Sequence, residues 1–239
     1  MKVAEKAKLA RIPLAVSSVY WDFSFANYSV STVCFSEQWS LRTLSKIHPQ
    51  LAVAFGRFRE NIGPGAHRRR SARCRLLQLA DIVLPNSIAE LEILVQHFRQ
   101  PQLRGKSMII PNGVKISKDS VVATSGQLSE LPSSYVLQAA SFHPVKGQDR
   151  LIEALMNDIE IPLVFVGSSV KNSRYGERCR ELGEKRGNTF FIEEVAYLQM
   201  PLFYKRATVH VLPSLRESPG LASLEAAIYG AQCVVSIHC

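Results

Sequence analysis

The sequence predicts an α/β protein built from doubly wound parallel sheets. The main observation is the second half of the chain, where short apolar runs alternate with longer segments of helical pattern, as parallel strands alternate with the helices that connect them. The composition agrees, since 46% of the 239 residues are hydrophobic and 21% are charged. In addition, residues 207–229 predict a strand, a glycine loop and a helix in succession, which fits such a fold.

The first half is predicted to hold a few strands among helices. We expect strands at residues 12–19, 81–84 and 108–110. We expect a helix at 36–47 with Ser36 as its cap, a turn at 63–65, a basic helix at 67–79 and a helix at 87–98. Ser87 caps this last helix, because Glu90 three residues later completes a capping-box pattern. The serine-rich segment 115–132 lacks aromatic residues and is predicted to be a linker between domains.

The second half is predicted to alternate strictly between strands and helices. The expected strands are residues 135–139, 163–166, 189–191, 208–212 and 233–236. The expected helices are residues 148–155, 175–184, 198–206 and 221–229. Ligands in parallel sheets of this kind bind at the carboxyl ends of the strands. The loops at these ends are therefore the place to look for a site.

One loop carries the clearest candidate site. Glu217 lies among Pro, Ser and Gly residues, and Glu225 follows eight positions later in a predicted helix. The backbone N–H groups of Gly220 and Leu221 stand at the N-terminus of that helix, where an anion can bind. Carboxylates beside an anion suit hydrogen bonds from sugar hydroxyls, because an ionised carboxylate only accepts. Taken by itself the spacing is weak, and a loop glutamate with a solvated helix glutamate is the ordinary alternative.

The surrounding sequence resembles family 4 (group 1) glycosyltransferases, which are retaining enzymes with the GT-B fold. The resemblance rests on five segments in the family's order, over about 160 residues: 80–87 (ADIVLPNS), 111–114 (PNGV), 135–148 (YVLQAASFHPVKGQ), 161–167 (IPLVFVG) and 212–236. It implies a role for each residue of a donor site. Glu217, the expected catalytic residue, would contact the donor sugar, and Glu225 would bind the ribose hydroxyls. Lys146 would hold the diphosphate together with the Gly220 and Leu221 amides.

Two further positions complete the donor site that the resemblance implies. Val195 would border the base, and Ser141 stands in the lysine loop where the family usually has an arginine. No metal ion and no cofactor are implied, because cationic side chains and a helix N-terminus take the place of a cation. The implied reaction moves a sugar from a nucleotide diphosphate sugar to a glycan or lipid-linked acceptor, in cell-surface polysaccharide biosynthesis.

The GT-B fold has two Rossmann-like domains, and the resemblance divides the chain between them. We expect residues 1–130 to be the C-terminal part of the acceptor-side domain with the linker. Residues 131–239 would be the N-terminal part of the nucleotide-sugar donor domain. The expectation is a fragment that lacks both ends. The alternatives are a compact variant with unusual termini, or an inactive remnant that binds nucleotide without transferring sugar.

Positive charge is concentrated in the first half of the chain. Residues 1–130 hold 18 Lys and Arg against 9 Asp and Glu, whereas residues 131–239 hold 11 of each, for a net charge of +9. The excess is densest at residues 68–75 and predicts an anionic partner. No RNA-binding, zinc-finger or helix-turn-helix pattern accompanies it. A peripheral contact with an anionic membrane or a lipid phosphate is therefore favoured over nucleic acid, with a solvated basic helix face as the alternative.

Cysteine usage and hydropathy bear on the compartment. The five cysteines are scattered and never spaced C-x-x-C, which argues against a disulfide framework or a zinc site and fits a reducing cytoplasm. There is no apolar run of 18 residues and no secretion signal at the N-terminus. The expected location is the cytoplasm, with the inner face of the membrane included because of the basic half.

Overall fold

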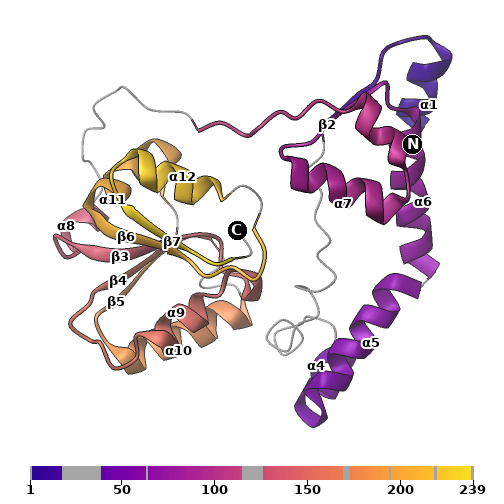
Figure 1. Cartoon of the computed structure of the whole chain (residues 1–239). Helices are drawn as coiled ribbons and strands as arrows, with labels where there is room; N and C mark the ends of the chain where they lie inside the picture. The colour runs from indigo at the N-terminus through magenta and orange to yellow at the C-terminus, as the bar shows by residue number, and fades with distance from the viewer. Residues whose placement is uncertain are drawn as a thin grey trace. The chain divides into compact units, whose positions relative to one another are not determined.

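The structure is a computed structural model that describes residues 2–17, 39–62, 64–114, 126–168, 173–193, 195–217 and 220–237. It consists of two compact units, Met1–Asn112 and Gly113–Cys239. Each unit contains parallel strands with helices packed around them (Figure 1). We describe the two units separately.

The first unit has a short sheet surrounded by helices. Strands β1 (Ala15–Ser17) and β2 (Ile82–Leu84) pair in parallel, with Val16 opposite Val83. The helices are α1 (Lys2–Leu9), α4 (Trp39–Ile47), α5 (Pro49–Ile62), α6 (Pro64–Leu79), α7 (Ile88–Phe98) and the 3₁₀ helix η1 (Pro101–Lys106). The core lies where α6, α7 and η1 meet β2, and it contains Leu77, Val83, Leu94, Phe98 and Leu103.

The predicted cap of α7 is confirmed, with one change. The Ser87 hydroxyl accepts a hydrogen bond from the backbone N–H of Glu90 at 3.1 Å. The Glu90 carboxylate, however, accepts from the N–H of Asn86 at 2.7 Å, one residue before the cap. Glu90 is buried by this contact. The two bonds together satisfy N–H groups at the entrance of the helix.

Several predictions for the first unit are wrong or incomplete. The turn expected at 63–65 is wrong for its last two residues, because Pro64 begins α6. A proline suits the first helical position, where its missing N–H is not needed. Residues 108–110 are not a strand, although Met108 and Ile110 donate to the carbonyls of Val83 and Pro85. Helices α1 and α5 were not predicted, and the proposed cap Ser36 lies outside the described residues.

The second unit contains a five-stranded, fully parallel sheet. Its strands are β3 (Tyr135–Ala139), β4 (Leu163–Val166), β5 (Thr189–Ile192), β6 (Ala207–Leu212) and β7 (Gln232–Val235), in the spatial order β5-β4-β3-β6-β7. The chain builds outward from β3 to β5 and then crosses back to place β6 on the other side of β3. The carboxyl ends of β3 and β6 are thus neighbours at the point where the winding reverses, which is where doubly wound sheets bind ligands.

Helices cover both faces of this sheet. Helices α9 (Gln148–Ala154) and α10 (Arg174–Arg186) pack on one face, and α11 (Met200–Arg206) and α12 (Leu221–Ile228) pack on the other (Figure 1). Strand β4 is buried throughout, as expected for the middle of a covered parallel sheet. The predicted alternation and the doubly wound sheet are therefore confirmed.

The end of the predicted linker belongs to the core of the second unit. Helix α8 (Gly126–Ser129) lies in this segment, and the side chains of Leu128 and Leu131 are buried against the core that holds Tyr135 and Phe203. The guanidinium of Arg206 also donates to the carbonyl of Leu128 at 2.5 Å. The linker prediction is therefore wrong for this part of the segment. The segment is rich in serine, but Leu128 and Leu131 are three positions apart and are both buried in the core.

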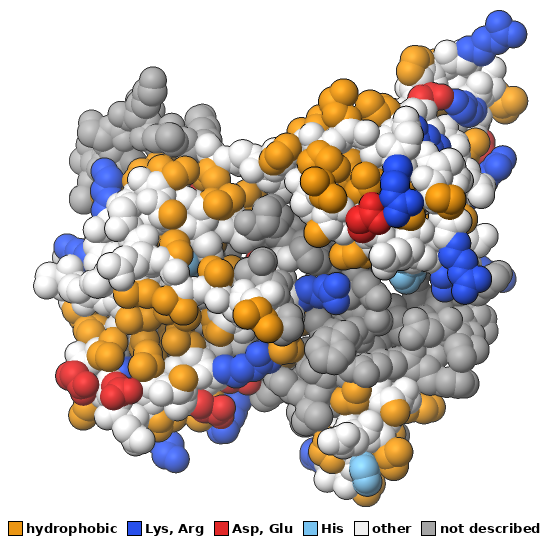
Figure 2. All heavy atoms as spheres, in the orientation of Figure 1, with side chains coloured by type: hydrophobic (Ala, Val, Ile, Leu, Met, Phe, Trp, Pro, Cys, Tyr) orange, Lys and Arg blue, Asp and Glu red, His pale blue; other side chains and the backbone are white. Residues whose placement is uncertain are grey.

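Apolar side chains are also exposed on the first unit. Figure 2 shows hydrophobic side chains gathered over β2 and the start of α7. Ile88, Met108 and Ile110 are among the exposed large hydrophobic residues of this region. An exposed apolar area of this kind is a feature of surfaces that meet a partner or a membrane.

Candidate functional site

A cavity of about 230 Å³ opens at the carboxyl ends of β3 and β6. Its lining consists of Ala139, Ala140, Ser141, Lys146, Leu212, Glu217, Gly220, Leu221 and Ala222. The predicted residues that the structure brings together here are Ser141, Lys146, Glu217, Gly220 and Leu221. They come from two loops that are separated by about 70 residues of sequence and that meet only because β3 and β6 are adjacent.

The lysine loop is held against the loop that follows β6. It ends in the 3₁₀ helix η2 (Pro144–Lys146) and at Gly147, whose φ is +69°. A Cβ atom at Gly147 would lie 2.7 Å from the carbonyl oxygen of Pro213, so glycine is required both by conformation and by the close approach. The N–H of Leu215 donates to the carbonyl of Val145 at 2.7 Å. The two loops therefore have a fixed separation.

Two buried glutamines support the lysine loop from inside the unit. The Gln138 amide donates to the Lys146 carbonyl at 2.8 Å, and the Gln148 amide donates to the Ser141 carbonyl at 2.9 Å. The Oε1 atoms of both glutamines have no hydrogen-bond partner in the described part of the chain. Such buried unsatisfied atoms are uncommon and carry a cost. Both amides thus serve to position the loop backbone.

Lys146 and Glu217 form an ion pair inside the cavity. The ammonium nitrogen of Lys146 lies 2.5 Å from Oε2 of Glu217, and the side chains are 25% and 11% exposed. The Ser214 hydroxyl donates to the same carboxylate oxygen at 3.2 Å. Nearby, burial and the charge of Lys146 hold the pKa of His143 below its ordinary value, so that His143 is neutral at pH 7.

Helix α12 begins at the edge of the cavity. Gly220 precedes it with φ of +56°, in the left-handed region, and contributes no side-chain cap. The first N–H groups of a helix have no partner within the helix and carry its positive dipole end. Gly220 and Leu221 line the cavity, so this end of α12 faces it.

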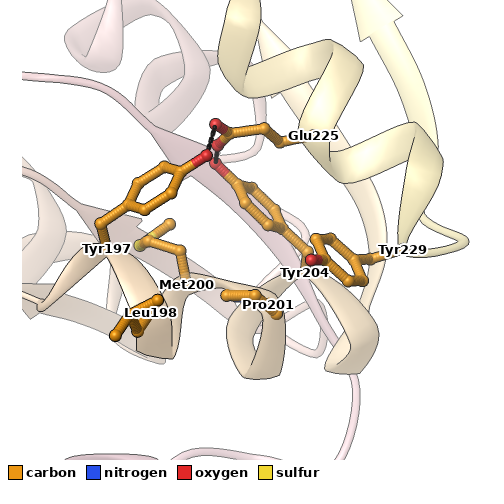
Figure 3. Close-up of a pocket in the computed structure, with 7 residues that line it drawn as sticks. All are labelled: Tyr197, Leu198, Met200, Pro201, Tyr204, Glu225 and Tyr229. Carbon is orange, nitrogen blue, oxygen red and sulfur yellow. Dashed lines mark hydrogen bonds between the residues drawn. The ribbon is translucent and has the colours of Figure 1, made fainter. Parts of the chain in front are cut away.

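Glu225 lines a second, much narrower pocket. Its two carboxylate oxygens accept hydrogen bonds from the hydroxyls of Tyr197 at 3.1 Å and Tyr204 at 2.9 Å. Figure 3 shows both hydroxyls pointing toward the carboxylate, with Tyr229 stacked beside Tyr204. Burial, followed by the nearby carboxylate, raises the pKa of Tyr204, which keeps its hydroxyl protonated as a donor. The hydrogen bond to Glu225 raises the pKa of Tyr197 as well.

Known proteins resemble this chain in sequence. Residues 126–239 match the model of the family described as Glycosyl transferases group 1. This part of the chain belongs to that family. The D-inositol 3-phosphate glycosyltransferases of Streptomyces avermitilis and Streptomyces bingchenggensis are each 24% identical to this chain, over 214 and 224 residues. These matches cover 82% and 84% of the chain but 45% and 48% of the relatives, so it spans about half of their length.

Solved structures resemble this chain in fold. Sucrose-phosphate synthase from Thermosynechococcus elongatus has a TM-score of 0.60 at 21% identity. The match covers 99% of this chain and 60% of the synthase chain. A trehalose-6-phosphate enzyme from E. coli, bound with UDP-2-fluoro glucose, has a TM-score of 0.53 at 12% identity and covers 74% of this chain and 50% of its own. The predicted α/β fold of the GT-B type, with parallel sheets in two Rossmann-like parts, is confirmed.

The remaining predicted residues, Glu225 and Val195, do not line the cavity. Glu225 does not line it, but Leu221 and Ala222 precede Glu225 by four and three positions and therefore lie on the same side of α12. Val195 is partly buried and packs against the core of the second unit.

Tyr197 and Tyr204 were missed by the sequence interpretation. Tyr204 lies in a predicted helix at a position typical of a core residue, and it is indeed buried. Only its contact with Glu225, 21 residues later, reveals a polar role. Within the described residues, no group of three or more His, Cys, Asp or Glu could hold a metal ion. No helix among them is both long and apolar enough to span a membrane.

Proposed function

We propose that the second unit binds a nucleotide diphosphate sugar, and that the protein transfers its sugar with retention to a glycan or lipid-linked acceptor in cell-surface polysaccharide biosynthesis. One observation carries this proposal. The cavity at the winding reversal of the sheet combines a lysine, a glutamate and the N-terminus of a helix. This combination suits a ligand that has both an anionic part and a hydroxyl-rich part.

The proposal gives each group one task. Lys146 and the N-terminus of α12 bind the diphosphate, and Glu217 accepts a hydrogen bond from a hydroxyl of the donor sugar. As the sugar departs, negative charge gathers on the diphosphate, and the same positive groups stabilise it. Ser141 adds no charge at the place where the family has an arginine, so the leaving group has less electrostatic support than in the usual pattern.

Glu225 is proposed to bind the ribose hydroxyls from the neighbouring pocket. Tyr197 and Tyr204 hold its carboxylate in place, and each carboxylate oxygen has a second lone pair for a ribose hydroxyl. Val195, at the start of the segment that carries Tyr197, is proposed to border the base. In this proposal Glu217 contacts the sugar, Lys146 and the N-terminus of α12 contact the diphosphate, and Glu225 contacts the nucleoside.

Isothermal titration calorimetry with UDP and GDP tests the donor site. Lys146→Ala and Glu225→Ala should each weaken binding of the preferred nucleotide by about 1.5–3 kcal/mol, because each removes a hydrogen bond that involves a charged group. Lys185→Ala, an exposed lysine on α10, is the matched control and should bind as the wild type does. Equal affinity in wild type, Lys146→Ala and Glu225→Ala would show that the site is assigned to the wrong residues.

The second candidate is nucleotide binding without sugar transfer, which the uncharged Ser141 favours. A panel of nucleotide sugars separates the candidates, because a remnant would bind a nucleotide and release no nucleoside diphosphate from any donor.

For the first unit we propose contact with an anionic membrane surface or lipid phosphate at the inner face of the cytoplasmic membrane. An open groove of about 420 Å³, lined by Arg70, Ser71, Cys74, Arg75, Gln78 and Phe98, supports this proposal. Nucleic acid is not the proposed partner.

A further inference from the structure

The Lys146 ammonium group, which the proposed ligand needs, is already paired with Glu217. Lys146 is the single cationic side chain among the described residues that line the cavity, since Ser141 stands where the family has an arginine. Its ammonium group already contacts the Glu217 carboxylate at 2.5 Å. Because neither side chain is widely exposed, solvent and salt screen this attraction less than they would on the surface. A diphosphate that enters the cavity must therefore compete with Glu217 for Lys146.

The surrounding backbone prevents the pair from separating by a loop movement. Leu215 donates to the Val145 carbonyl, one residue before Lys146, and Gly147 lies against the Pro213 carbonyl. The side-chain amide of Gln138 also donates a hydrogen bond to the Lys146 carbonyl. A ligand can break the ion pair by rotating side chains, but both charged groups stay next to the cavity. Glu217 then lies beside the bound diphosphate.

We infer that the Lys146–Glu217 pair makes the cavity select a nucleotide diphosphate sugar against the bare nucleoside diphosphate. A bare diphosphate takes Lys146 away from the Glu217 carboxylate and places a second anion beside that carboxylate, which is unfavourable. A sugar that remains attached to the diphosphate supplies a hydroxyl that donates to Glu217 and compensates it. The inference rests on the proposed function, and it assigns discrimination between donor and product to one carboxylate.

The same competition favours release of the product. Once the sugar has left, Glu217 no longer receives a hydrogen bond from the sugar hydroxyl, and its return to Lys146 restores the ion pair. Re-formation of the pair displaces the nucleoside diphosphate from its main cationic contact. Glu217 thus acts on both the choice of donor and the departure of the product.

Glu217→Gln tests the inference, because glutamine keeps the size of the side chain and removes its charge. Calorimetry of the full chain with UDP, GDP, UDP-glucose and GDP-mannose gives four affinities per variant. Wild type should bind the nucleotide sugar of the preferred base more tightly than the corresponding nucleoside diphosphate. Glu217→Gln should bind that nucleoside diphosphate about tenfold more tightly than wild type, because Lys146 is released. Its preference for the nucleotide sugar should fall to about twofold or less.

Two further variants keep the test decisive. Glu184→Gln removes an exposed charge on α10 and should leave all four affinities unchanged. Glu217→Asp retracts the carboxylate from Lys146 and should strengthen binding of the nucleoside diphosphate by an intermediate amount, which covers the case in which Glu217→Gln does not fold. If wild type binds none of the four nucleotides, the proposed function is overturned. If wild type binds them and both Glu217 variants bind the nucleoside diphosphate as weakly as wild type or more weakly, the inference alone is overturned.

Discussion

At the scale of single residues, His210 contacts both strand β3 and helix α12. It lies in β6 and is completely buried. Its Nε2 accepts the backbone N–H of Ala139, which lines the cavity, and its Nδ1 faces the hydroxyl of Ser223 in α12, each at 3.4 Å. Because Nε2 accepts, the proton of the neutral ring is on Nδ1, which donates to Ser223. Burial lowers the pKa of His210 to about 4.

This histidine makes stability depend on pH in a defined window. The unfolded chain binds a proton at His210 near its ordinary pKa of 6.5, whereas the folded chain does so only near pH 4. Since the unfolded state holds more protons in between, the free energy of unfolding should fall by about 3 kcal/mol as the pH drops from 6.5 to 4 and change little from this source below pH 4. Urea denaturation at a series of pH values measures this fall.

His210→Gln provides the comparison, because glutamine can still accept the Ala139 N–H but does not titrate in this range. The wild type should lose its stability relative to His210→Gln between pH 6.5 and 4, while the carboxylates contribute alike to both proteins. Parallel pH profiles for the two proteins would contradict the assignment.

At the scale of elements, Gly183 allows helix α10 to pack closely against the sheet. A Cβ atom at Gly183 would lie 2.6 Å from the ring of Phe191 in β5. Phe191 stacks on Phe165 of β4, with ring centroids 5.4 Å apart and an interplanar angle of 14°, so the ring has little room to retreat. Glycine normally costs a helix stability. Here it allows the helix to approach the sheet closely.

Gly183→Ala should therefore destabilise the second unit although alanine favours helix. Overpacking costs about 1–3 kcal/mol and the helix gains about 1 kcal/mol, which leaves a net loss on the order of 1 kcal/mol. Chemical denaturation measures it against Glu184→Ala, an exposed neighbour on the same helix that should change stability by less than about 0.5 kcal/mol. The double variant Gly183→Ala/Phe191→Leu should recover part of the loss. A Gly183→Ala protein more stable than wild type would show that the ring moves freely.

At the scale of the whole molecule, charge divides the chain. The first half carries the entire excess of +9, and the exposed Arg70 and Arg75 of α6 line the groove of the first unit. The Arg70 guanidinium donates to the carbonyl of His97 at 2.6 Å, which fixes one end of the groove. The second unit is balanced, as a unit that recognises a single small ligand can be. Long-range attraction to an anionic surface therefore acts on the first unit.

Co-sedimentation with vesicles tests this attraction. The full chain should bind phosphatidylglycerol-containing vesicles and not pure phosphatidylcholine vesicles, and added salt should weaken the binding. Arg70→Gln/Arg75→Gln should reduce vesicle affinity by about 2 kcal/mol, at about 1 kcal/mol for each basic residue near the surface. Arg174→Gln/Lys185→Gln, two exposed positions on α10, is the charge-matched control. Salt-sensitive gel shifts with DNA or RNA, without vesicle binding, would reverse the choice of partner.

The sequence alone determined the strands and helices of the second unit and the loops that carry Lys146, Glu217 and Gly220. Alternating apolar runs report local structure, and parallel strands place their ligands at one edge, so position along the chain sufficed. The sequence interpretation did not predict α1 and α5, because no capping pattern or following strand marked these two segments as helices. It also could not reveal buried polar residues such as Arg186, which looks like a surface residue of α10 yet donates to the carbonyls of Leu155, Asp158 and Ile161.

Only the tertiary structure decided which side chains meet. The ion pair joins residues 71 positions apart, and the tyrosine contacts of Glu225 join residues 28 and 21 positions apart. Local patterns contain no information about such pairs, because they depend on the order in which strands are laid beside β3. The crossing from β5 back to β6 brings the lysine loop and the glutamate loop together. The candidate site exists because the winding of the sheet reverses there.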